Sequence, residues 1–215
     1  MTAFNSVVLD VDSTVSAVEG IDWLAAQRDD AVAATVLALT ADAMESRVPL
    51  DEVYERRLSI IRPTRAEIAQ LSYVYIATAM PGVRDAIAAW QGAGVRVVLV
   101  SGGLRDALLP LARWLGIAPD DLHAVDVDYD DGGTTVGLHG DAPLARRGGK
   151  PLVVAALNLE RPTLAVGDGA TDAELASIVD RFLAFTGVAR RESVVARAAG
   201  EAESFAALTP IVLGI

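Results

Sequence analysis

Residues 6–14 read SVVLDVDST, a short apolar run that ends in aspartates and hydroxyl residues. A continuous apolar run of this length, bounded by polar residues, indicates a strand buried on both faces, as in a parallel sheet. Similar runs follow at 95–103 (VRVVLVSGG), 163–169 (TLAVGDG) and 181–185 (RFLAF). Helical patterns separate these later runs, so the sequence predicts an α/β fold: a parallel sheet with helices on both faces.

The segment 17–79 interrupts this alternation of strands and helices. It is rich in Ala, Leu, Glu and Arg at helical spacing and contains no strand-like run. Because it follows the first strand, we expect a small helical module inserted into a sheet domain formed by residues 1–16 and 80–215. Within that domain, HAVDVDYDDGGTTVGLHG (123–140) predicts a hairpin with DDGG as its turn.

The composition limits the classes of function. The chain has 215 residues, 52% hydrophobic and 22% charged, which is typical of a folded globular protein. Its net charge of −11 argues against a nucleic-acid or anionic-membrane surface, and means that an anionic substrate needs a local cationic site. Cysteine is absent, which excludes disulfides and thiolate chemistry. The N-terminus lacks a signal-peptide pattern and no apolar run reaches the ~20 residues of a membrane span, so we expect a cytoplasmic monomer or homodimer.

Polar side chains follow the first three strands. In open parallel sheets the ligand site lies outside the carboxyl ends of the strands. The candidates at those ends are Asp10, Asp12, Ser101, Asp168, Thr171 and Asp172. On a continuing strand the first two aspartates would point to opposite faces, but a turn at Ser13-Thr14 would bring both to this edge.

Each motif alone has a plain structural interpretation. DxDST can be a strand end followed by a helix cap, and SGG can be a turn. GDGATD is similar to the start of a dinucleotide fingerprint, but it lacks the third glycine and lies late in the chain. Their convergence on one edge of the sheet instead favours a single site.

Lys150, in ARRGGKPLVV (145–154), is the one lysine among 18 basic residues and opens the helix that leads into the third strand. One interpretation is that this lysine has no special role and occurs by chance in a composition that favours arginine. Alternatively, the position needs a compact ammonium rather than a planar guanidinium. The clustered carboxylates nearby would repel one another without a cation, and hard oxygen ligands suit Mg²⁺.

A phosphate at this edge would receive backbone N–H groups, the Ser101 hydroxyl and the Lys150 ammonium. The chain has no cysteine, and its two histidines, His123 and His139, form no recognisable pairing. The best available nucleophile is therefore a carboxylate. The chemistry that fits is phosphoryl transfer through an aspartyl-phosphate.

Taken as a set, four motifs resemble the haloacid dehalogenase superfamily of phosphatases and, within it, the phosphoserine phosphatase family. The motifs are DVDSTVSAVEGID (10–22), SGGLR (101–105), GGK (148–150) and GDGATD (167–172). The resemblance covers nearly the whole chain. It implies a Rossmann-like core and identifies 17–79 as a small helical cap that closes over the site.

The resemblance also implies roles for the residues at the strand ends. Asp10 is the nucleophile and Asp12 the general acid/base, while Mg²⁺ is held by Asp10, the backbone carbonyl of Asp12 and Asp168. Asp172 supports the metal indirectly or through a water. The phosphoryl oxygens are bound by Ser101, Gly102, Lys150 and Thr171.

The resemblance further implies that the cap selects the substrate. Glu19 lies near the substrate ammonium, Arg57 in YERRL binds the substrate carboxylate, and Met44 is an apolar contact. Ser46 departs from the family pattern, which has glycine there, and leaves the substrate open. From the residues alone, the pattern at Arg57 is typical of a solvated helix surface, and Glu19 can simply be a favourable acid near a helix start.

The predicted function is Mg²⁺-dependent hydrolysis of O-phospho-L-serine to serine and phosphate, as in serine biosynthesis. Phosphohomoserine, phosphothreonine, a phosphosugar acid or transfer to an alcohol stay open as alternatives. A signalling receiver module also gathers carboxylates and a lysine around Mg²⁺, but it is shorter and carries its acid pair as adjacent residues. A non-catalytic binding protein is disfavoured because no catalytic position is missing.

Overall fold

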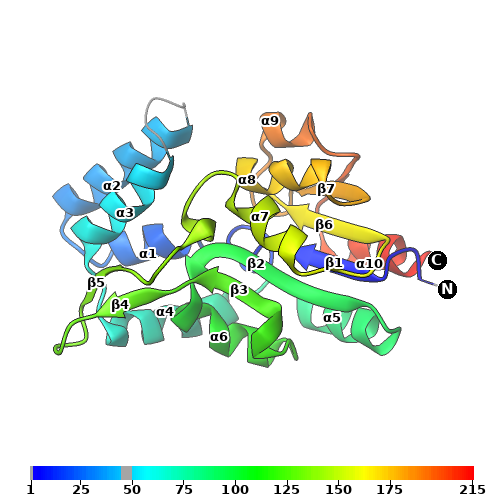
Figure 1. The fold of residues 1–215 in the computed structure, drawn as a ribbon, viewed down its shortest axis with the longest axis horizontal. Helices are drawn as coiled ribbons and strands as arrows, with labels where there is room; N and C mark the ends of the chain where they lie inside the picture. The colour runs from blue at the N-terminus through cyan, green and yellow to red at the C-terminus, as the bar shows by residue number, and fades with distance from the viewer. Residues whose placement is uncertain (1, 45–49) are drawn as a thin grey trace.

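The computed structural model describes residues 2–44 and 50–215, and of residues 40–44 and 50–52 the backbone alone. In this part of the chain, strands form a parallel sheet in the order β3-β2-β1-β6-β7-β8 (Figure 1). The predicted α/β fold with a parallel sheet is confirmed. The strands are β1 (Ser6–Leu9), β2 (Arg96–Leu104), β3 (Leu122–Val125), β6 (Thr163–Gly167), β7 (Arg181–Phe185) and β8 (Glu201–Ala202).

Helices cover both faces of the sheet, which explains why its strands are apolar almost throughout. Val7 packs on one face with Trp90 and Phe205, whereas its neighbour Val8 packs on the other with Val154. On the first face lie α5 (Val83–Gly92), α6 (Arg105–Trp114) and α10 (Phe205–Leu213). On the second lie α7 (Gly149–Ala156), α8 (Ala170–Ala173) and α9 (Glu192–Val195).

Between β1 and α5, the described residues form four further helices. The backbone at the two ends of this segment is paired: the Ala17 N–H donates to the Thr78 carbonyl and the Met80 N–H to the Val15 carbonyl, both at 2.9 Å. The helices are α1 (Gly20–Ala25), α2 (Asp30–Met44), α3 (Leu50–Ile61) and α4 (Arg65–Ala77). The fourth packs against α6, while α2 and α3 stand apart from the sheet (Figure 1). The division into a core and a 17–79 cap stays a prediction.

The hairpin predicted over 123–140 is wrong in its first part. Its first residues belong to β3, which pairs in parallel with β2 at the edge of the main sheet. Only β4 (Val127–Tyr129) and β5 (Thr135–Leu138) form an antiparallel hairpin. An edge strand, half exposed, carries the same alternation of residues as a hairpin strand, so the pattern does not distinguish the two. Among the helices described, none has the length and apolar character to cross a membrane.

Candidate active site

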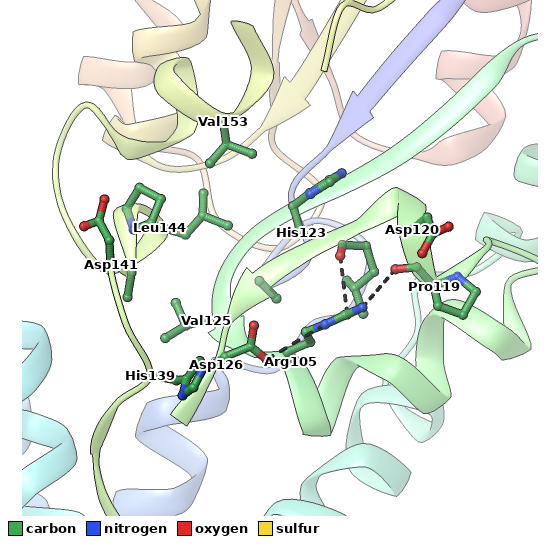
Figure 2. A pocket seen from close by; sticks show the side chains of 14 residues that line it. Arg105, Pro119, Asp120, His123, Val125, Asp126, His139, Asp141, Leu144 and Val153 are labelled. Carbon is green, nitrogen blue, oxygen red and sulfur yellow. Dashed lines mark hydrogen bonds and ion pairs between the residues drawn. The ribbon is translucent and has the colours of Figure 1, made fainter. Parts of the chain in front are cut away.

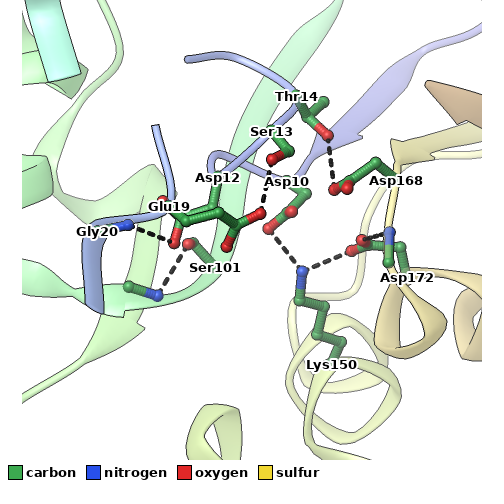
Figure 3. A network of polar contacts seen from close by, with 12 residues as sticks. Asp10, Asp12, Ser13, Thr14, Glu19, Gly20, Ser101, Lys150, Asp168 and Asp172 are labelled. Atoms are coloured by element: carbon green, nitrogen blue, oxygen red, sulfur yellow. Dashed lines mark hydrogen bonds and ion pairs between the residues drawn. The ribbon is translucent and has the colours of Figure 1, made fainter. Parts of the chain in front are cut away.

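Three charged side chains meet at the carboxyl edge of the sheet (Figure 3). The Lys150 ammonium, from the first turn of α7, lies 2.6 Å from Asp10 Oδ1 and 2.5 Å from Asp172 Oδ1. The three side chains are almost fully buried, with exposed fractions of 6%, 8% and 2%. Because an unpaired buried charge costs several kcal/mol, these groups are stable there only as a set.

The same contacts shift the pKa values of Lys150 and Asp10. Burial opposes the charge of Lys150, but Asp10 and Asp172 outweigh it and hold the lysine pKa above its ordinary value. Burial and the Asp172 carboxylate raise the pKa of Asp10 to about 7, against the lowering effect of Lys150. A further cation beside Asp10 would lower that pKa and favour the carboxylate.

Asp168, at the end of β6, completes a carboxylate cluster. Its Oδ1 accepts a hydrogen bond from Thr14 Oγ1 at 3.4 Å, and its other oxygen is ion-paired with the Arg191 guanidinium. One carboxylate oxygen from each of Asp10, Asp168 and Asp172 lies within 4.8 Å of the other two. Three hard anionic oxygens at this spacing fit a divalent cation.

Gly167 allows Asp172 to approach the end of β6. A Cβ at this position would overlap the Asp172 carboxyl group, so any larger residue would displace that carboxylate from Lys150. The Asp172 carboxylate also accepts from the Gly169 N–H at 2.9 Å, which fixes it at the start of α8. The first glycine of GDGATD, Gly167, is thus explained by the close approach of the Asp172 side chain.

The expected turn after Asp12 is present. β1 ends at Leu9, and Ser13 adopts a left-handed φ of 53°. The N–H groups of Thr14 and Val15 donate to the Val11 carbonyl at 3.2 and 2.9 Å. Because this turn reverses the chain, Asp10 and Asp12 both lie at the carboxyl edge (Figure 3).

The Asp12 carboxyl group has partners on the inserted helices. Tyr75 Oη donates to Asp12 Oδ1 at 2.6 Å, and the Gly20 N–H donates to Oδ2 at 3.4 Å. Burial raises the pKa of Asp12 to about 8, with repulsion from Glu19 and Asp10 adding to it. A carboxyl group with such a pKa carries a proton near neutral pH, which a general acid requires.

The structure places the remaining edge residues as follows. Ser101 is fully buried in β2, and its hydroxyl accepts from the Gly103 N–H at 3.0 Å. The Gly102 carbonyl accepts from Tyr54 Oη at 2.8 Å, which connects α3 to the end of β2. Thr171 is half-buried in the first turn of α8.

The predicted cap residues are spread over the start of α1, the end of α2 and the body of α3. Glu19 precedes α1 and accepts from Ser13 Oγ at 2.6 Å. The Arg57 guanidinium on α3 lies 3.9 Å from Asp22 Oδ1 and 5.8 Å from the centre of the Tyr54 ring. Met44 ends α2, but its side chain, like the whole of Ser46, lies outside the described residues.

Tyr54, Tyr75 and Arg191 reach the site without having been singled out from the sequence. A buried tyrosine on an inserted helix has the same pattern as any core aromatic. Arg191 follows another arginine in a loop, a pattern typical of solvated surface. Their side chains are found only through tertiary packing, so no local signal identified them.

A hollow of about 400 Å³ lies beside the edge strand β3 (Figure 2). Both histidines of the chain line it, and His139 Nδ1 lies 2.9 Å from Asp128 Oδ1. Burial lowers the pKa of His123 and favours its neutral form. Within the described chain, none of the predicted site residues lines this hollow, so it is separate from the carboxylate cluster.

Comparison with known proteins agrees with this geometry. Residues 7–177 match the family model described as haloacid dehalogenase-like hydrolase. Phosphoserine phosphatase of Rattus norvegicus is 33% identical over 193 residues, covering 88% of this chain and 85% of that protein. The chloroplastic phosphoserine phosphatase of Arabidopsis thaliana is 33% identical over 198 residues, covering 90% of this chain and 66% of the relative. A phosphoserine phosphohydrolase-like protein from Francisella tularensis has the same fold, with a TM-score of 0.86, 22% identity and coverage of 97% and 99%.

Proposed function

The chain belongs to the haloacid dehalogenase-like hydrolases, and on that premise we propose that it hydrolyses O-phospho-L-serine to serine and phosphate with Mg²⁺. The observation that carries the proposal is the buried pairing of Asp10 with Lys150, with Asp12 two residues further along at the same edge (Figure 3). In this proposal Asp10 is the nucleophile, Lys150 the cation beside it and Asp12 the proton donor. Relatives named phosphoserine phosphatase, 33% identical over most of the chain, support this substrate.

In the proposed mechanism Asp10 attacks phosphorus in line with the seryl oxygen. The bond between phosphorus and that oxygen breaks as Asp12 delivers its proton to the leaving alkoxide, and an aspartyl-phosphate forms on Asp10. Asp12 then takes a proton from water, which attacks the aspartyl-phosphate and releases phosphate. A positioned acid typically contributes ~10²–10⁴-fold when the leaving group is an alkoxide.

In this proposal the residues around Asp10 neutralise the negative charge on the phosphoryl group. The Lys150 ammonium neutralises both the nucleophile and the phosphoryl oxygens, and its small size suits a pocket that already contains Asp172. We assign Ser101, Gly102 and Thr171 to the phosphoryl oxygens. Asp10, the Asp12 carbonyl and Asp168 would hold Mg²⁺, with Asp172 in support. The metal when bound would supply positive charge against the phosphoryl group.

The cap would supply the amino-acid selectivity. In this proposal Glu19 binds the substrate ammonium, Arg57 its carboxylate and Met44 its apolar part, as 17–79 closes over the sheet edge. The hydrogen bond from Tyr54 to Gly102 supports this arrangement because it joins α3 to the phosphate-binding end of β2. The cytoplasmic location and the choice between monomer and homodimer stay predictions.

Phosphate release tests the proposal. The substrates are O-phospho-L-serine, phosphothreonine, phosphohomoserine, phosphoglycolate and p-nitrophenyl phosphate, each with Mg²⁺ or EDTA, and Asp10→Asn is the blank. We expect Mg²⁺-dependent release with a strong preference for phosphoserine. Release from p-nitrophenyl phosphate alone would contradict the substrate but keep the chemistry. No release from any ester by a folded sample would contradict the phosphatase itself.

A further inference from the structure

We propose that Tyr75, on α4, is a positioning residue for the proton transfer by Asp12, an inference that rests on the proposed function. Its hydroxyl donates to Asp12 Oδ1 at 2.6 Å, which is shorter than the 3.4 Å hydrogen bond from the Gly20 N–H to the other oxygen of that carboxyl group. Nothing in the sequence motifs points to this residue, which lies 63 positions from Asp12. The contact therefore depends on how α4 packs beside the sheet edge.

The Tyr75 side chain is held firmly in place. It is fully buried in the main hydrophobic cluster, together with Leu71 of the same helix. A Cβ on Gly20 would overlap the Tyr75 hydroxyl, and one on Gly103 would lie 3.2 Å from it. The hydroxyl thus occupies a slot between the start of α1 and the end of β2 that exists because both neighbours are glycine.

This placement distinguishes the two oxygens of Asp12. A phenol has one proton to donate, and here it goes to Oδ1. When Asp12 is in its acid form, this hydrogen bond favours Oδ1 as the carbonyl oxygen and the proton on Oδ2, where the Gly20 N–H makes only a long contact of 3.4 Å. Tyr75 also restricts rotation of the carboxyl group. The acid is therefore presented with its proton on a defined atom and in a defined direction.

The proposal predicts that Tyr75→Phe lowers activity on phosphoserine and leaves activity on p-nitrophenyl phosphate nearly unchanged. A seryl alkoxide needs a proton to leave, whereas p-nitrophenolate leaves without one. Because kcat/KM reports the step in which the leaving group departs, we expect kcat/KM for phosphoserine to fall by about 10- to 100-fold. For p-nitrophenyl phosphate we expect a change of no more than about twofold, since no proton transfer assists that departure.

Two controls separate positioning from general structural damage. Tyr129→Phe removes a similar hydroxyl, which donates to Asp106 Oδ2 at 2.7 Å away from the site, and should leave both activities unchanged. In an Asp12→Asn background, adding Tyr75→Phe should lower kcat/KM for phosphoserine no further, because the acid through which Tyr75 acts is gone. Thermal unfolding of each variant reports whether its fold is intact.

Several outcomes would overturn the proposal. Equal losses on both esters, an equal further loss in the Asp12→Asn background, or no loss on phosphoserine would each remove the positioning role. These results require a wild-type enzyme that hydrolyses phosphoserine. A wild type active only on p-nitrophenyl phosphate would instead contradict the proposed substrate, so the two failures are distinguishable.

Discussion

The edge of the sheet and the inserted helices hold their charged side chains in different ways. At the edge, Lys150 bonds to Asp10 and Asp172 and all three are buried. Just before α1, Glu19 is about half exposed and bonds to Ser13, while Arg57 on α3 lies 3.9 Å from Asp22. The edge is therefore assembled before substrate arrives, whereas we expect the cap residues to take up their roles on the substrate itself. Changes at the edge should affect both catalysis and stability, and changes in the cap should affect selection among substrates.

The largest effect is expected for Asp10→Asn. An amide is not a nucleophile toward phosphorus, so kcat should fall by at least ~10³-fold on every phosphate ester. Phosphate release under saturating substrate measures it, with circular dichroism to show that the variant folds. Turnover within about tenfold of wild type would show that the edge cluster is not where the phosphoryl group is transferred.

The next effect is expected on stability, for Lys150→Met. This change leaves two buried carboxylates without their cation, and breaking a buried pair in this way costs about 3–5 kcal/mol. Urea unfolding at neutral pH measures the free energy. Arg146→Met is the matched control, because its ion pair with Asp141 at 2.5 Å is exposed and should contribute about 1 kcal/mol or less. Equal losses in the two variants would contradict the view that the edge is stable only as a charged set.

Arg57→Ala tests whether the predicted cap selects the substrate. Losing a charged hydrogen bond to the substrate carboxylate, at about 1.5–3 kcal/mol, should raise KM for phosphoserine by about 10- to 100-fold. Activity on p-nitrophenyl phosphate, which has no carboxylate, should be unchanged. Arg56→Ala is the control, since this neighbour on α3 is exposed. If both esters lose activity together, Arg57 supports the fold of the cap and does not select the substrate.

The sequence predicts the edge better than the cap for a physical reason. Parallel strands bring their carboxyl ends to one place, so residues such as Ser101 and Asp168 are located once the strands are recognised. Tyr75 and Arg191 reach the site through helix packing and a loop, which leave no periodic signal in the sequence. The prediction of a single hairpin over 123–140 was wrong in its first part for a related reason, because pairing partners are not encoded in local alternation.

The smallest effect concerns an ion pair within the inserted helices. Arg28, just after α1, forms two hydrogen bonds with Glu67 in the first turn of α4, one of them at 2.8 Å between Nη2 and Oε2. The hydrogen bonds from Arg28, assisted by those from Thr64, lower the pKa of Glu67 from 4.5 to about 2. The stability that Glu67 contributes is therefore complete above its unfolded pKa and is lost as the pH falls from about 4.5 toward 2.

Glu67→Gln isolates this charge, because glutamine also serves in the capping box that Glu67 forms with Thr64. Solvent screens a partly exposed ion pair, so we expect the free energy of unfolding of wild type to exceed that of the variant by about 1 kcal/mol at pH 6. Urea unfolding from pH 6 to pH 3 should show this difference shrinking on acidification, while Glu203→Gln, an exposed control, shows none. A difference that persists unchanged at pH 3 would mean that Glu67 acts through packing and not through its charge. The contact between α1 and α4 would then depend on packing, in sharper contrast with the charged edge of the sheet.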